Sequence, residues 1–325
     1  MSLKLLRLQD CIRDQNEVNR VFVFKKEQQV FDFGGIRFGG NPGENPTVLV
    51  GGLFFKGQEI VNDTKSGTFD KTLAKNWIDA AVSMSKRTGH PIVLQVYGRT
   101  PEAMDNHIPW VIENFDGPIM FESINSRARI RSVEICEEQS LSQRAIYNSV
   151  NISLTNEEKE ILATSSLDMT VVLGWSPRTT SLPERMNVIQ DLVTTSSKLG
   201  FTKMLIDPAT MPVGAGYGLD YRTVVAVKSE LGLPTCLAPD NAPSAWKFLK
   251  QPEFNDESLY MSSAVAAATA AQLSATDCIM FGSLARSREV FTAVSLIANA
   301  ISAGVAESYR ALGIKKTLFS PPTFE

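Results

Sequence analysis

Two short segments, "MLIDPATMP" (204–212) and "CLAPDNAPSAW" (236–246), decide which fold this sequence favours. In each, an apolar run typical of a buried strand is followed by a polar residue beside proline, Asp207 in the first segment and Asn241 in the second. Ligands of α/β proteins bind at the carboxyl ends of parallel strands. The two segments therefore predict a parallel sheet with a binding site at its carboxyl edge.

The rest of the chain repeats the strand-then-helix pattern. Strands are predicted at 47–55, 91–98, 118–123, 145–150, 169–175, 203–208, 234–239 and 277–283. These runs are rich in Val, Ile and Leu without strict alternation, which is typical of a parallel sheet covered on both faces. Alternation of strands and helices over roughly 250 residues favours a single (β/α)8 TIM barrel. A doubly wound open sheet is the alternative, but "GGLFFKGQEI" (51–60) lacks the GxGxxG spacing expected after its first strand.

The N-terminal part has a different pattern. Residues up to about Asn19 are predicted to form a short amphipathic helix. "VFVF" (21–24), "QVFDFGG" (29–35) and "IRFGG" (36–40) then show period-two apolar residues and glycine turns, which indicate a β-hairpin. The predicted organisation is a helix and hairpin cap in residues 1–45 and a barrel in residues 46–325.

The composition excludes several classes of function. Hydrophobic residues make up 43% of the 325 residues, charged residues 21%, and the net charge is −3 without a block of like charges. This is the profile of a soluble globular protein and does not support nucleic-acid binding. The start of the chain lacks the apolar run of a signal peptide. The charge-free run from Val290 to Ala306 is too polar and slightly short for a membrane span, so a buried or subunit-contacting helix is expected there. We expect a cytoplasmic protein that forms a homodimer.

Few residues are suited to metal or disulfide chemistry. The four cysteines, at 11, 136, 236 and 278, are far apart, which favours reduced thiols over a disulfide framework or a zinc site. The histidines, His90 and His107, are too few for a histidine-rich metal site or a triad. We therefore expect no protein-bound metal.

Polar residues stand at or just past the ends of four of the predicted strands. They alternate between acid and amide in chain order: Glu122, Asn148, Asp207 and Asn241. Catalytic residues of a TIM barrel come from these strand ends. A carboxylate can accept two hydrogen bonds from a 2-amino-pyrimidinone edge, and an amide can both donate and accept at ring nitrogens. A pterin ring has that edge.

Three of these residues, and two of their neighbours, also have a structural interpretation. Asp207 precedes a proline and suits a turn. Asp240 or Asn241 suits the N-cap of the following helix, and Asn148 and Asn151 suit turns. Four polar residues at successive strand ends favour a site.

Several motifs resemble a known family. "MLIDPATMP" resembles the strand–Asp–Pro element of the pterin-binding methyltransferases, which share their barrel with dihydropteroate synthases. "LAPDNAPSAW" (237–246) resembles the strand whose Asn reaches N5 of the folate in methyltetrahydrofolate:corrinoid methyltransferases. "FESIN" (121–125) and "YNSVN" (147–151) match two earlier segments of that family in order and spacing.

The most specific part lies near the N-terminus. "FKKEQQVFDFGGIRFGGNPGENPTVLVGGLFF" (24–55), followed by "DTKSGTFDKTLAKNWI" (63–78), resembles the H subunit of the tetrahydromethanopterin S-methyltransferase complex and its bacterial relatives. The resemblance extends from about residue 20 to the end of the chain.

The resemblance implies roles for three residues. Asn241 should hydrogen-bond the pterin near N5, Asp207 should hold the pyrimidine edge, and Asn148 should bind the same ring. Two features depart from the family pattern. Glu122 stands where relatives often carry Asp, and its longer side chain could route a proton through water. The strand at 91–98 lacks the usual Asp or Asn, so Gln95 or Tyr97 is expected to substitute, although Tyr97 equally suits packing.

The implied reaction is methyl transfer from a methylated corrinoid to N5 of tetrahydrofolate. In "DNHIPW" (105–110), Asp105 and His107 fit the corrinoid-binding pattern Asp-x-His-x-x-Gly, but Trp110 replaces the glycine. A surface or capping histidine is the preferred interpretation of His107. We therefore expect the cobalamin to be carried by a partner protein that docks over the barrel mouth.

Alternatives remain open at this point. Tetrahydromethanopterin could replace tetrahydrofolate, and the reaction could run toward the corrinoid. A dihydropteroate synthase-like reaction would need a pyrophosphate site, for which Arg286 and Arg288 are candidates. A scaffolding subunit would bind pterin without turnover. The upstream methyl donor, such as a methylamine, a betaine or a methoxylated aromatic, is left open. The arginines 127, 129 and 131 could meet a folate's glutamate tail, but a solvated helix face is preferred.

Overall fold

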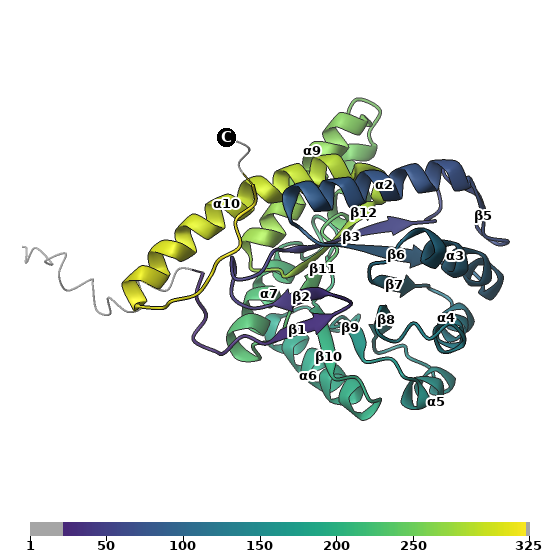
Figure 1. Cartoon of the computed structure of the whole chain (residues 1–325), viewed down its shortest axis with the longest axis horizontal. Helices are drawn as coiled ribbons and strands as arrows, with labels where there is room; N and C mark the ends of the chain where they lie inside the picture. The colour runs from purple at the N-terminus through teal and green to yellow at the C-terminus, as the bar shows by residue number, and fades with distance from the viewer. Residues whose placement is uncertain (1–21, 323–325) are drawn as a thin grey trace, which may run out of the picture.

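The computed structural model describes residues 22–322, and eight parallel strands in it form a closed barrel (Figure 1). The sheet order is β10-β9-β8-β7-β6-β3-β12-β11, and a parallel bridge between Ile206 and Thr235 joins the two outer strands. The predicted (β/α)8 barrel is confirmed, and the open sheet is wrong. The barrel strands are β3 (Val48–Leu53), β6 (Ile92–Tyr97), β7 (Ile119–Glu122), β8 (Ala145–Val150), β9 (Met169–Leu173), β10 (Lys203–Asp207), β11 (Cys236–Leu237) and β12 (Cys278–Ser283).

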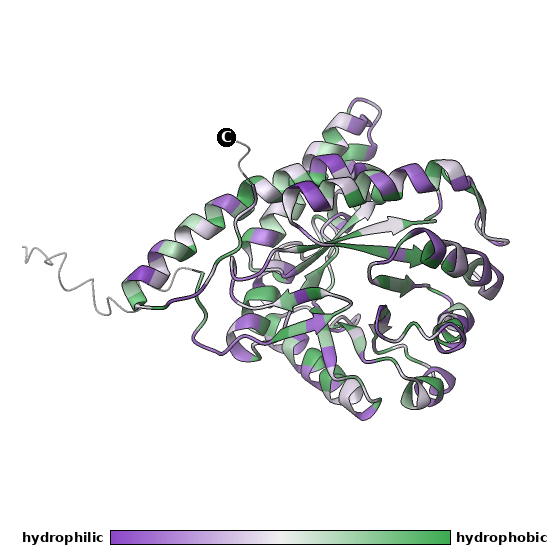
Figure 2. Ribbon diagram, in the orientation of Figure 1, coloured by the Kyte–Doolittle hydropathy of each residue, from purple (hydrophilic) through white to green (hydrophobic). Residues whose placement is uncertain are grey.

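Helices surround the barrel. In Figure 2 the strands β6 and β7 are largely hydrophobic, whereas the helices also carry hydrophilic residues. This is expected for a sheet that is covered on its outside. One short helix, α8 (Asn241–Ala245), follows β11 directly. The others are α2 (Lys71–Thr88), α3 (Pro101–Asn114), α4 (Ser126–Glu138), α5 (Asn156–Thr164), α6 (Leu182–Lys198), α7 (Leu219–Glu230), α9 (Glu257–Leu273), α10 (Ser287–Leu312) and the 3-10 helices η2 (Lys247–Lys250) and η3 (Leu284–Arg286).

Local sequence sets where these helices begin. Thr100 caps α3, since its Oγ1 accepts a hydrogen bond from the Ala103 N–H at 3.1 Å, and Pro101 occupies the first helical position, where no N–H is needed. Thr155 and Glu158 form a reciprocal capping box at the start of α5. These signals set where α3 and α5 begin, and therefore where the loops at the carboxyl ends of the strands end.

A hairpin closes the amino-terminal end of the barrel. It consists of β1 (Val30–Phe33) and β2 (Ile36–Gly39), and its side chains Phe33, Ile36 and Phe38 are buried against the barrel interior. Gly39 has φ +104, and a Cβ there would overlap the Gln29 carbonyl oxygen, so only glycine fits. With this end closed, the carboxyl end is the side of the barrel where a ligand can enter.

Part of the predicted N-terminal region differs from the structure. Residues 22–24 of the "VFVF" segment lie outside any strand. The predicted helix up to about Asn19 lies outside the described residues. A second small hairpin, β4 (Val61–Asp63) with β5 (Thr68–Phe69), follows β3 and was not predicted.

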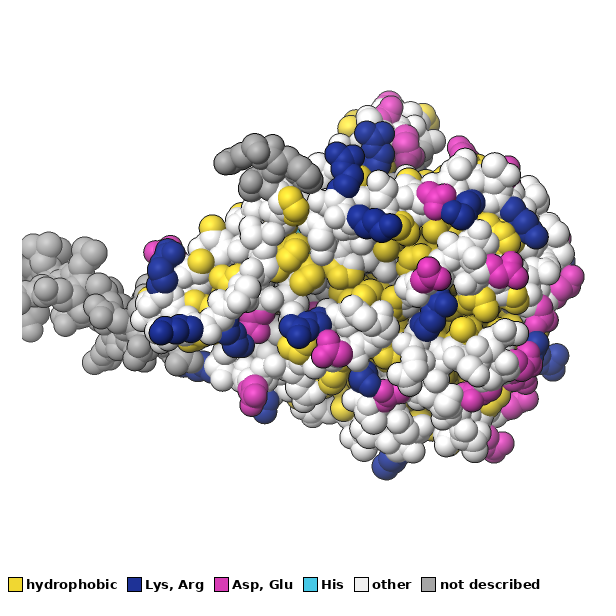
Figure 3. Space-filling model, viewed as in Figure 1, with side chains coloured by type: hydrophobic (Ala, Val, Ile, Leu, Met, Phe, Trp, Pro, Cys, Tyr) yellow, Lys and Arg dark blue, Asp and Glu magenta, His cyan; other side chains and the backbone are white. Residues whose placement is uncertain are grey.

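The C-terminal helix α10 is longer than its charge-free run. It packs on α9 and α2 and extends beyond the barrel, where Ile301, Val305 and Tyr309 contact Phe22 and Val23 (Figure 1). The segment 284–312, which is longer than the charge-free run, is long and apolar enough to cross a membrane by length and composition alone, a test that core helices also pass. Val290, Phe291 and Val294 in the charge-free run are buried, as expected for a packed helix. Apolar side chains are visible along α10 in Figure 3. One of its leucines, Leu296, is 71% exposed.

Candidate functional site

The carboxyl end of the barrel contains a cavity of about 1490 Å³, here called the carboxyl-end cavity. It exceeds the usual 300–1,000 Å³ of small-molecule pockets, so a pterin leaves room for a second reactant. Its lining includes five of the six predicted site residues, namely Gln95, Glu122, Asn148, Asp207 and Asn241.

Tyr97 is the predicted residue that is not in the lining. Its ring stacks on Phe55, with centroids 4.7 Å apart and an interplanar angle of 22°, and Phe55 itself lines the cavity. The packing interpretation of Tyr97 therefore fits the structure better, and Gln95 is the strand residue that faces the cavity.

Two carboxyl groups and an amide lie at the base of the cavity. The Gln95 side chain, 6% exposed, donates a hydrogen bond from Nε2 to Glu122 Oε2. Burial, together with the nearby negative charge of Asp207, raises the pKa of Glu122 to about 7. Burial likewise raises the pKa of Asp207 to about 7. Near neutral pH both groups can therefore gain or lose a proton, as proton-transfer chemistry requires.

Asp207 stabilises a turn with its side chain and also lines the cavity. Its Oδ1 accepts a hydrogen bond from the Ala209 N–H at 2.8 Å, so the predicted turn is present. Ala209 has φ +64, a left-handed conformation unusual for alanine. Arg185 is fully buried and donates from Nη1 to the carbonyl oxygens of Pro208 at 2.9 Å and Ala209 at 3.2 Å. This arginine holds the strained turn and with it the orientation of the Asp207 carboxyl.

Asn148 lies inside β8 rather than in a turn, and it is in register with Glu122 on β7. Its Nδ2 lies 3.6 Å from Met120 Sδ, a weak acceptor, and its side chain is half-buried. Asn151 is the turn residue, since its Oδ1 accepts the Ser153 N–H at 2.9 Å. The turn interpretation is thus wrong for Asn148 and correct for Asn151.

Asn241 is exposed at the first position of α8, next to a carboxylate that is held in place. Asp240 occupies the N-cap position, but its side chain makes no capping bond. Its Oδ1 instead accepts the Tyr260 hydroxyl at 2.8 Å and lies 3.6 Å from Arg286 Nη1. A Cβ at Gly282, which has φ +81, would overlap Asp240 Oδ2. This packing fixes the turn from which Asn241 faces the cavity.

Most of the apolar residues that line the carboxyl-end cavity were not predicted from the sequence. These side chains could stack on a flat ring or exclude water from it. A detectable signal existed for some of them, because aromatic residues end the predicted strands at 47–55 and 169–175. The missed apolar residues are Phe55, Trp77, Ile124, Ile152, Leu173, Trp175, Met261 and Met280.

The three arginines of α4 have different environments. Arg127 is exposed, and Arg131 pairs with Asp105 at 2.7 Å and with Glu138 at 2.7 Å. Arg129 is 8% exposed and lines the cavity. The expectation of a solvated helix face is therefore wrong for Arg129.

His107 belongs to the core. It is 3% exposed, stacks on Phe54 with centroids 3.9 Å apart, and its Nδ1 lies 2.8 Å from the Tyr97 carbonyl oxygen. Burial lowers its pKa to about 4. The expected surface or capping histidine is thus wrong, and this ring is not available to a corrinoid.

Two other features do not belong to this site. The glycine-rich loop "PVGAGYG" (212–218) between β10 and α7 contributes no residue to the lining of the carboxyl-end cavity. Among residues 22–322, no group of three or more His, Cys, Asp or Glu side chains is arranged to hold a metal ion.

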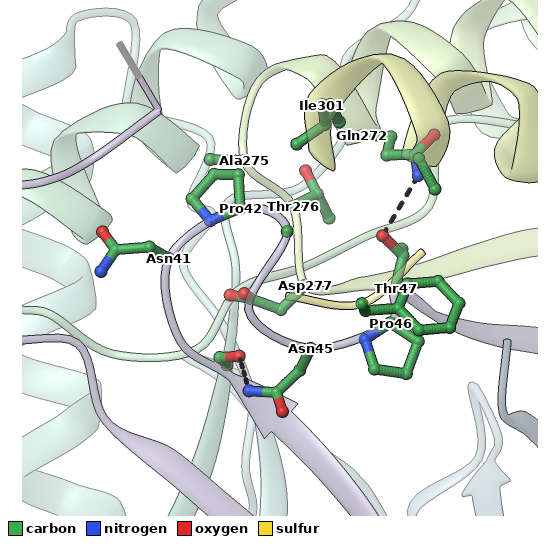
Figure 4. A pocket seen from close by; sticks show the side chains of 14 residues that line it. Asn41, Pro42, Asn45, Pro46, Thr47, Gln272, Ala275, Thr276, Asp277 and Ile301 are labelled. Atoms are coloured by element: carbon green, nitrogen blue, oxygen red, sulfur yellow. Dashed lines mark hydrogen bonds between the residues drawn. The ribbon is translucent and has the colours of Figure 1, made fainter. Parts of the chain in front are cut away.

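A second pocket lies at the amino-terminal end of the barrel (Figure 4). It is lined by Asn45, Thr47 and Asp277, among others, and Gln272 Nε2 lies 3.4 Å from Thr47 Oγ1. Its volume of about 30 Å³ suits a water molecule rather than a substrate. The carboxyl-end cavity is therefore the candidate site.

Comparison with known proteins agrees with this geometry. The family described as tetrahydromethanopterin S-methyltransferase MtrH subunit matches residues 26–315. The H subunit of the tetrahydromethanopterin S-methyltransferase of Methanothermobacter marburgensis is 34% identical over 284 residues, covering 85% of this chain and 92% of that protein. The corresponding protein of Methanosarcina barkeri is 32% identical over 289 residues, covering 85% and 92%.

Solved structures support the fold. A Yersinia pestis dihydropteroate synthase with a pterine–sulfa conjugate has a TM-score of 0.58 at 16% identity, covering 85% of this chain and 100% of that chain. The Xanthomonas albilineans dihydropteroate synthase with 4-aminobenzoic acid has a TM-score of 0.59 at 13% identity, covering 82% and 96%. At these identities the likeness concerns the barrel alone. Because the family match spans most of the sequence and the curated relatives exceed 30% identity, this chain belongs to the methyltransferase family of the tetrahydromethanopterin S-methyltransferase H subunit.

Proposed function

We propose that this protein transfers a methyl group from a methylated corrinoid protein to N5 of tetrahydrofolate, giving 5-methyltetrahydrofolate. The observation that carries the proposal is the set of polar side chains that face the carboxyl-end cavity from β6, β7, β8, β10 and the start of α8, namely Gln95, Glu122, Asn148, Asp207 and Asn241. They supply the donors and acceptors that a pterin edge needs. Membership of a methyltransferase family gives the reaction class.

In the proposed complex, Asp207 accepts hydrogen bonds from the 2-amino-pyrimidinone edge, and Asn148 binds the same ring. Asn241 lies near N5, where its amide can donate or accept as the nitrogen changes its protonation state. The N5 lone pair forms the new C–N bond while the carbon–cobalt bond breaks with both electrons on cobalt, and N5 loses its proton.

Glu122 is the carboxyl group that we assign to this proton. Its raised pKa of about 7 matches a group that must be ionised before the transfer and can hold a proton afterwards. Gln95, which donates to Glu122, keeps the carboxyl oriented. Most of the acceleration is expected from positioning two large reactants.

The cobalamin is proposed to arrive on a partner corrinoid protein that docks over the barrel mouth. The volume of about 1490 Å³ supports this, because it leaves space above a bound pterin. We further propose a cytoplasmic homodimer. Light scattering of the purified protein tests the dimer, and partition between soluble and membrane fractions tests the location.

A second candidate acceptor is tetrahydromethanopterin. The names of the relatives in Methanothermobacter marburgensis and Methanosarcina barkeri favour it. The same side chains would bind its pterin ring, so the acceptor must be decided by experiment.

The first test is anaerobic incubation with methylcobalamin and tetrahydrofolate while the cobalt spectrum is followed. We expect Co(I) and 5-methyltetrahydrofolate to form, and Asn241→Ala to lower the rate about 100-fold or more, as for removal of a hydrogen bond made in the transition state. Asn76→Ala, an exposed change on α2, is the matched control. Turnover only with tetrahydromethanopterin would change the acceptor. Pterin binding without turnover, even with a methylated corrinoid protein, would point to a scaffolding subunit and overturn the proposal.

A further inference from the structure

One cation in the wall of the carboxyl-end cavity has no role in the proposed chemistry. Arg129, the fourth residue of α4, lines the cavity although only 8% of it is exposed. A charge buried this deeply is normally fully paired. The way in which it is paired here leaves one side of the guanidinium free.

The guanidinium is fixed from two directions. Arg129 donates from Nε to Glu158 Oε1 at 2.6 Å and from Nη1 to the Ser123 carbonyl oxygen at 2.7 Å. Glu158, 1% exposed, also accepts from the Tyr147 hydroxyl at 3.1 Å and from the Thr155 N–H and hydroxyl at 2.9 Å. The Tyr147 hydroxyl is a further polar neighbour of the guanidinium. Within residues 22–322, the hydrogen bonds of Arg129 leave from Nε and Nη1, so Nη2 is the nitrogen open to a ligand.

The other cations of the cavity are less suited to a ligand. Arg286 is committed to acids, with Nη1 at 3.6 Å from Asp240 and Nη2 at 3.3 Å from Glu257, and it lies over the Tyr260 ring at 4.3 Å. Lys56 is exposed, so its flexible side chain would lose conformational entropy when it bound a ligand. Arg129 is therefore the pre-organised donor.

The position of Arg129 relative to the proposed pterin-binding residues indicates which part of the substrate it would contact. Its partner Ser123 directly follows Glu122, and both residues line the carboxyl-end cavity. The guanidinium thus lines the same cavity as the pterin-binding residues, into which a substituent of the ring would extend. The amino-terminal end of α4 adds a favourable field for an anion.

We propose that Arg129 binds an oxyanion on the tail of the pterin substrate, and that in tetrahydrofolate this oxyanion is a glutamate carboxylate. The proposal rests on the proposed function. A planar guanidinium with a free N–H suits carboxylate or phosphate. The ion pair with Glu158 positions the group for this contact.

The test compares substrates with and without the tail. We expect Arg129→Gln to raise KM for tetrahydrofolate about 10- to 100-fold, the usual effect of losing a charge-assisted hydrogen bond. KM for 6-methyltetrahydropterin, which has no tail, should stay within about threefold of the wild-type value. Arg127→Gln, an exposed change on the same helix, should alter neither.

Removal of Arg129 leaves Glu158 buried without its partner, which can impair folding. The double variant Arg129→Gln/Glu158→Gln avoids that charge and should show the same selective rise in KM. An equal loss with both substrates would overturn the proposal, because it would show a purely structural role.

Two further measurements separate the outcomes. Competition by p-aminobenzoylglutamate, lost in Arg129→Gln, supports a carboxylate tail, whereas competition by inorganic phosphate alone would overturn the glutamate assignment. If the wild type turns over neither substrate, the proposed function fails, and calorimetric binding of tetrahydrofolate against 6-methyltetrahydropterin still tests Arg129.

Discussion

Asp207 and Glu122 are carboxyl groups that the fold keeps in surroundings unfavourable to their charge. Both have a pKa of about 7, mainly because of burial. A residue chosen for stability alone would be apolar at either position, since burying a carboxylate is destabilising and the charge of Arg185 offsets only part of this cost at Asp207. Such locally unfavourable choices are expected at functional sites.

This arrangement predicts a pH-dependent stability. The pKa of Asp207 is about 7 in the folded chain, against an ordinary value of 3.8. Between these values the folded state retains a proton that the unfolded state has released, so stability must fall as pH rises, by up to about 1.4 kcal/mol per pH unit. Above pH 7 the contribution of Asp207 to the pH dependence of stability should end.

Asp207→Asn removes that contribution. The variant should equal the wild type near pH 4, become more stable than it by pH 8, and retain only the pH dependence that Glu122 contributes. Urea denaturation at several pH values measures the difference. Asp191→Asn, an exposed change on α6, is the control. Parallel pH profiles for wild type and Asp207→Asn would contradict the raised pKa of Asp207.

At the scale of residues, the sequence could identify Asp207 and Asn241 because each stands at the end of an apolar run, Asp207 directly and Asn241 after Asp240. The burial of Arg129 and His107 could not be predicted in the same way. Arg129 pairs with Glu158, 29 positions later, and His107 stacks on Phe54 from a different strand-end loop. Both environments depend on contacts between elements that a local pattern does not contain.

At the scale of elements, the apolar runs predicted all eight barrel strands, but their ends differ. β11 is only Cys236–Leu237, shorter than the predicted 234–239, and Pro234 and Pro239 flank it without an N–H for the ladder. α10 extends beyond its charge-free run because charged residues such as Glu307 lie on its exposed face rather than at its end.

The turn after β12 gives a prediction about how elements hold the site. Gly282→Ala would introduce a Cβ that overlaps Asp240 Oδ2, in a backbone conformation with φ +81. The carboxylate must move, and Asn241 next to it moves too. We expect kcat/KM for methyl transfer to fall about 10- to 100-fold, since small displacements of positioning groups have effects of this size.

The control separates strain from displacement. Gly200 has φ +97, and no atom lies within 4 Å of the Cβ that a substitution would add, so Gly200→Ala carries the backbone strain alone. Both variants should lose about 1 kcal/mol or more of stability, and only Gly282→Ala should lose activity. Full activity in Gly282→Ala would show that Asp240 does not position Asn241.

At the scale of the whole molecule, the two ends of the barrel differ in structure and in expected role. The carboxyl end carries the polar cavity, and the amino-terminal end is closed by β1 and β2. In TIM barrels the first end is associated with catalysis and the second with stability. An ion pair at the closed end allows this division to be tested.

Lys228 on α7 is fully buried at the closed end. Its Nζ donates to the Gly40 carbonyl oxygen at 2.7 Å and to both carboxylate oxygens of Asp277 at 2.9 and 2.8 Å. Asp277 also accepts the Thr235 N–H at 2.8 Å. One ammonium group thus joins the end of the hairpin, a barrel helix and the segments that lead into β11 and β12.

Lys228→Met leaves Asp277 buried without its cation, so we expect a loss of about 3–5 kcal/mol in the free energy of unfolding. Lys228→Met/Asp277→Asn should recover part of that loss, because no unpaired charge remains. Since Asn241 and Asp207 lie at the opposite end, kcat/KM measured well below the melting transition should equal that of the wild type. Urea denaturation and the methylcobalamin assay measure the two quantities on the same samples. A fall in kcat/KM without a fall in stability would contradict the division, because it would mean that the closed end acts on the geometry of the cavity.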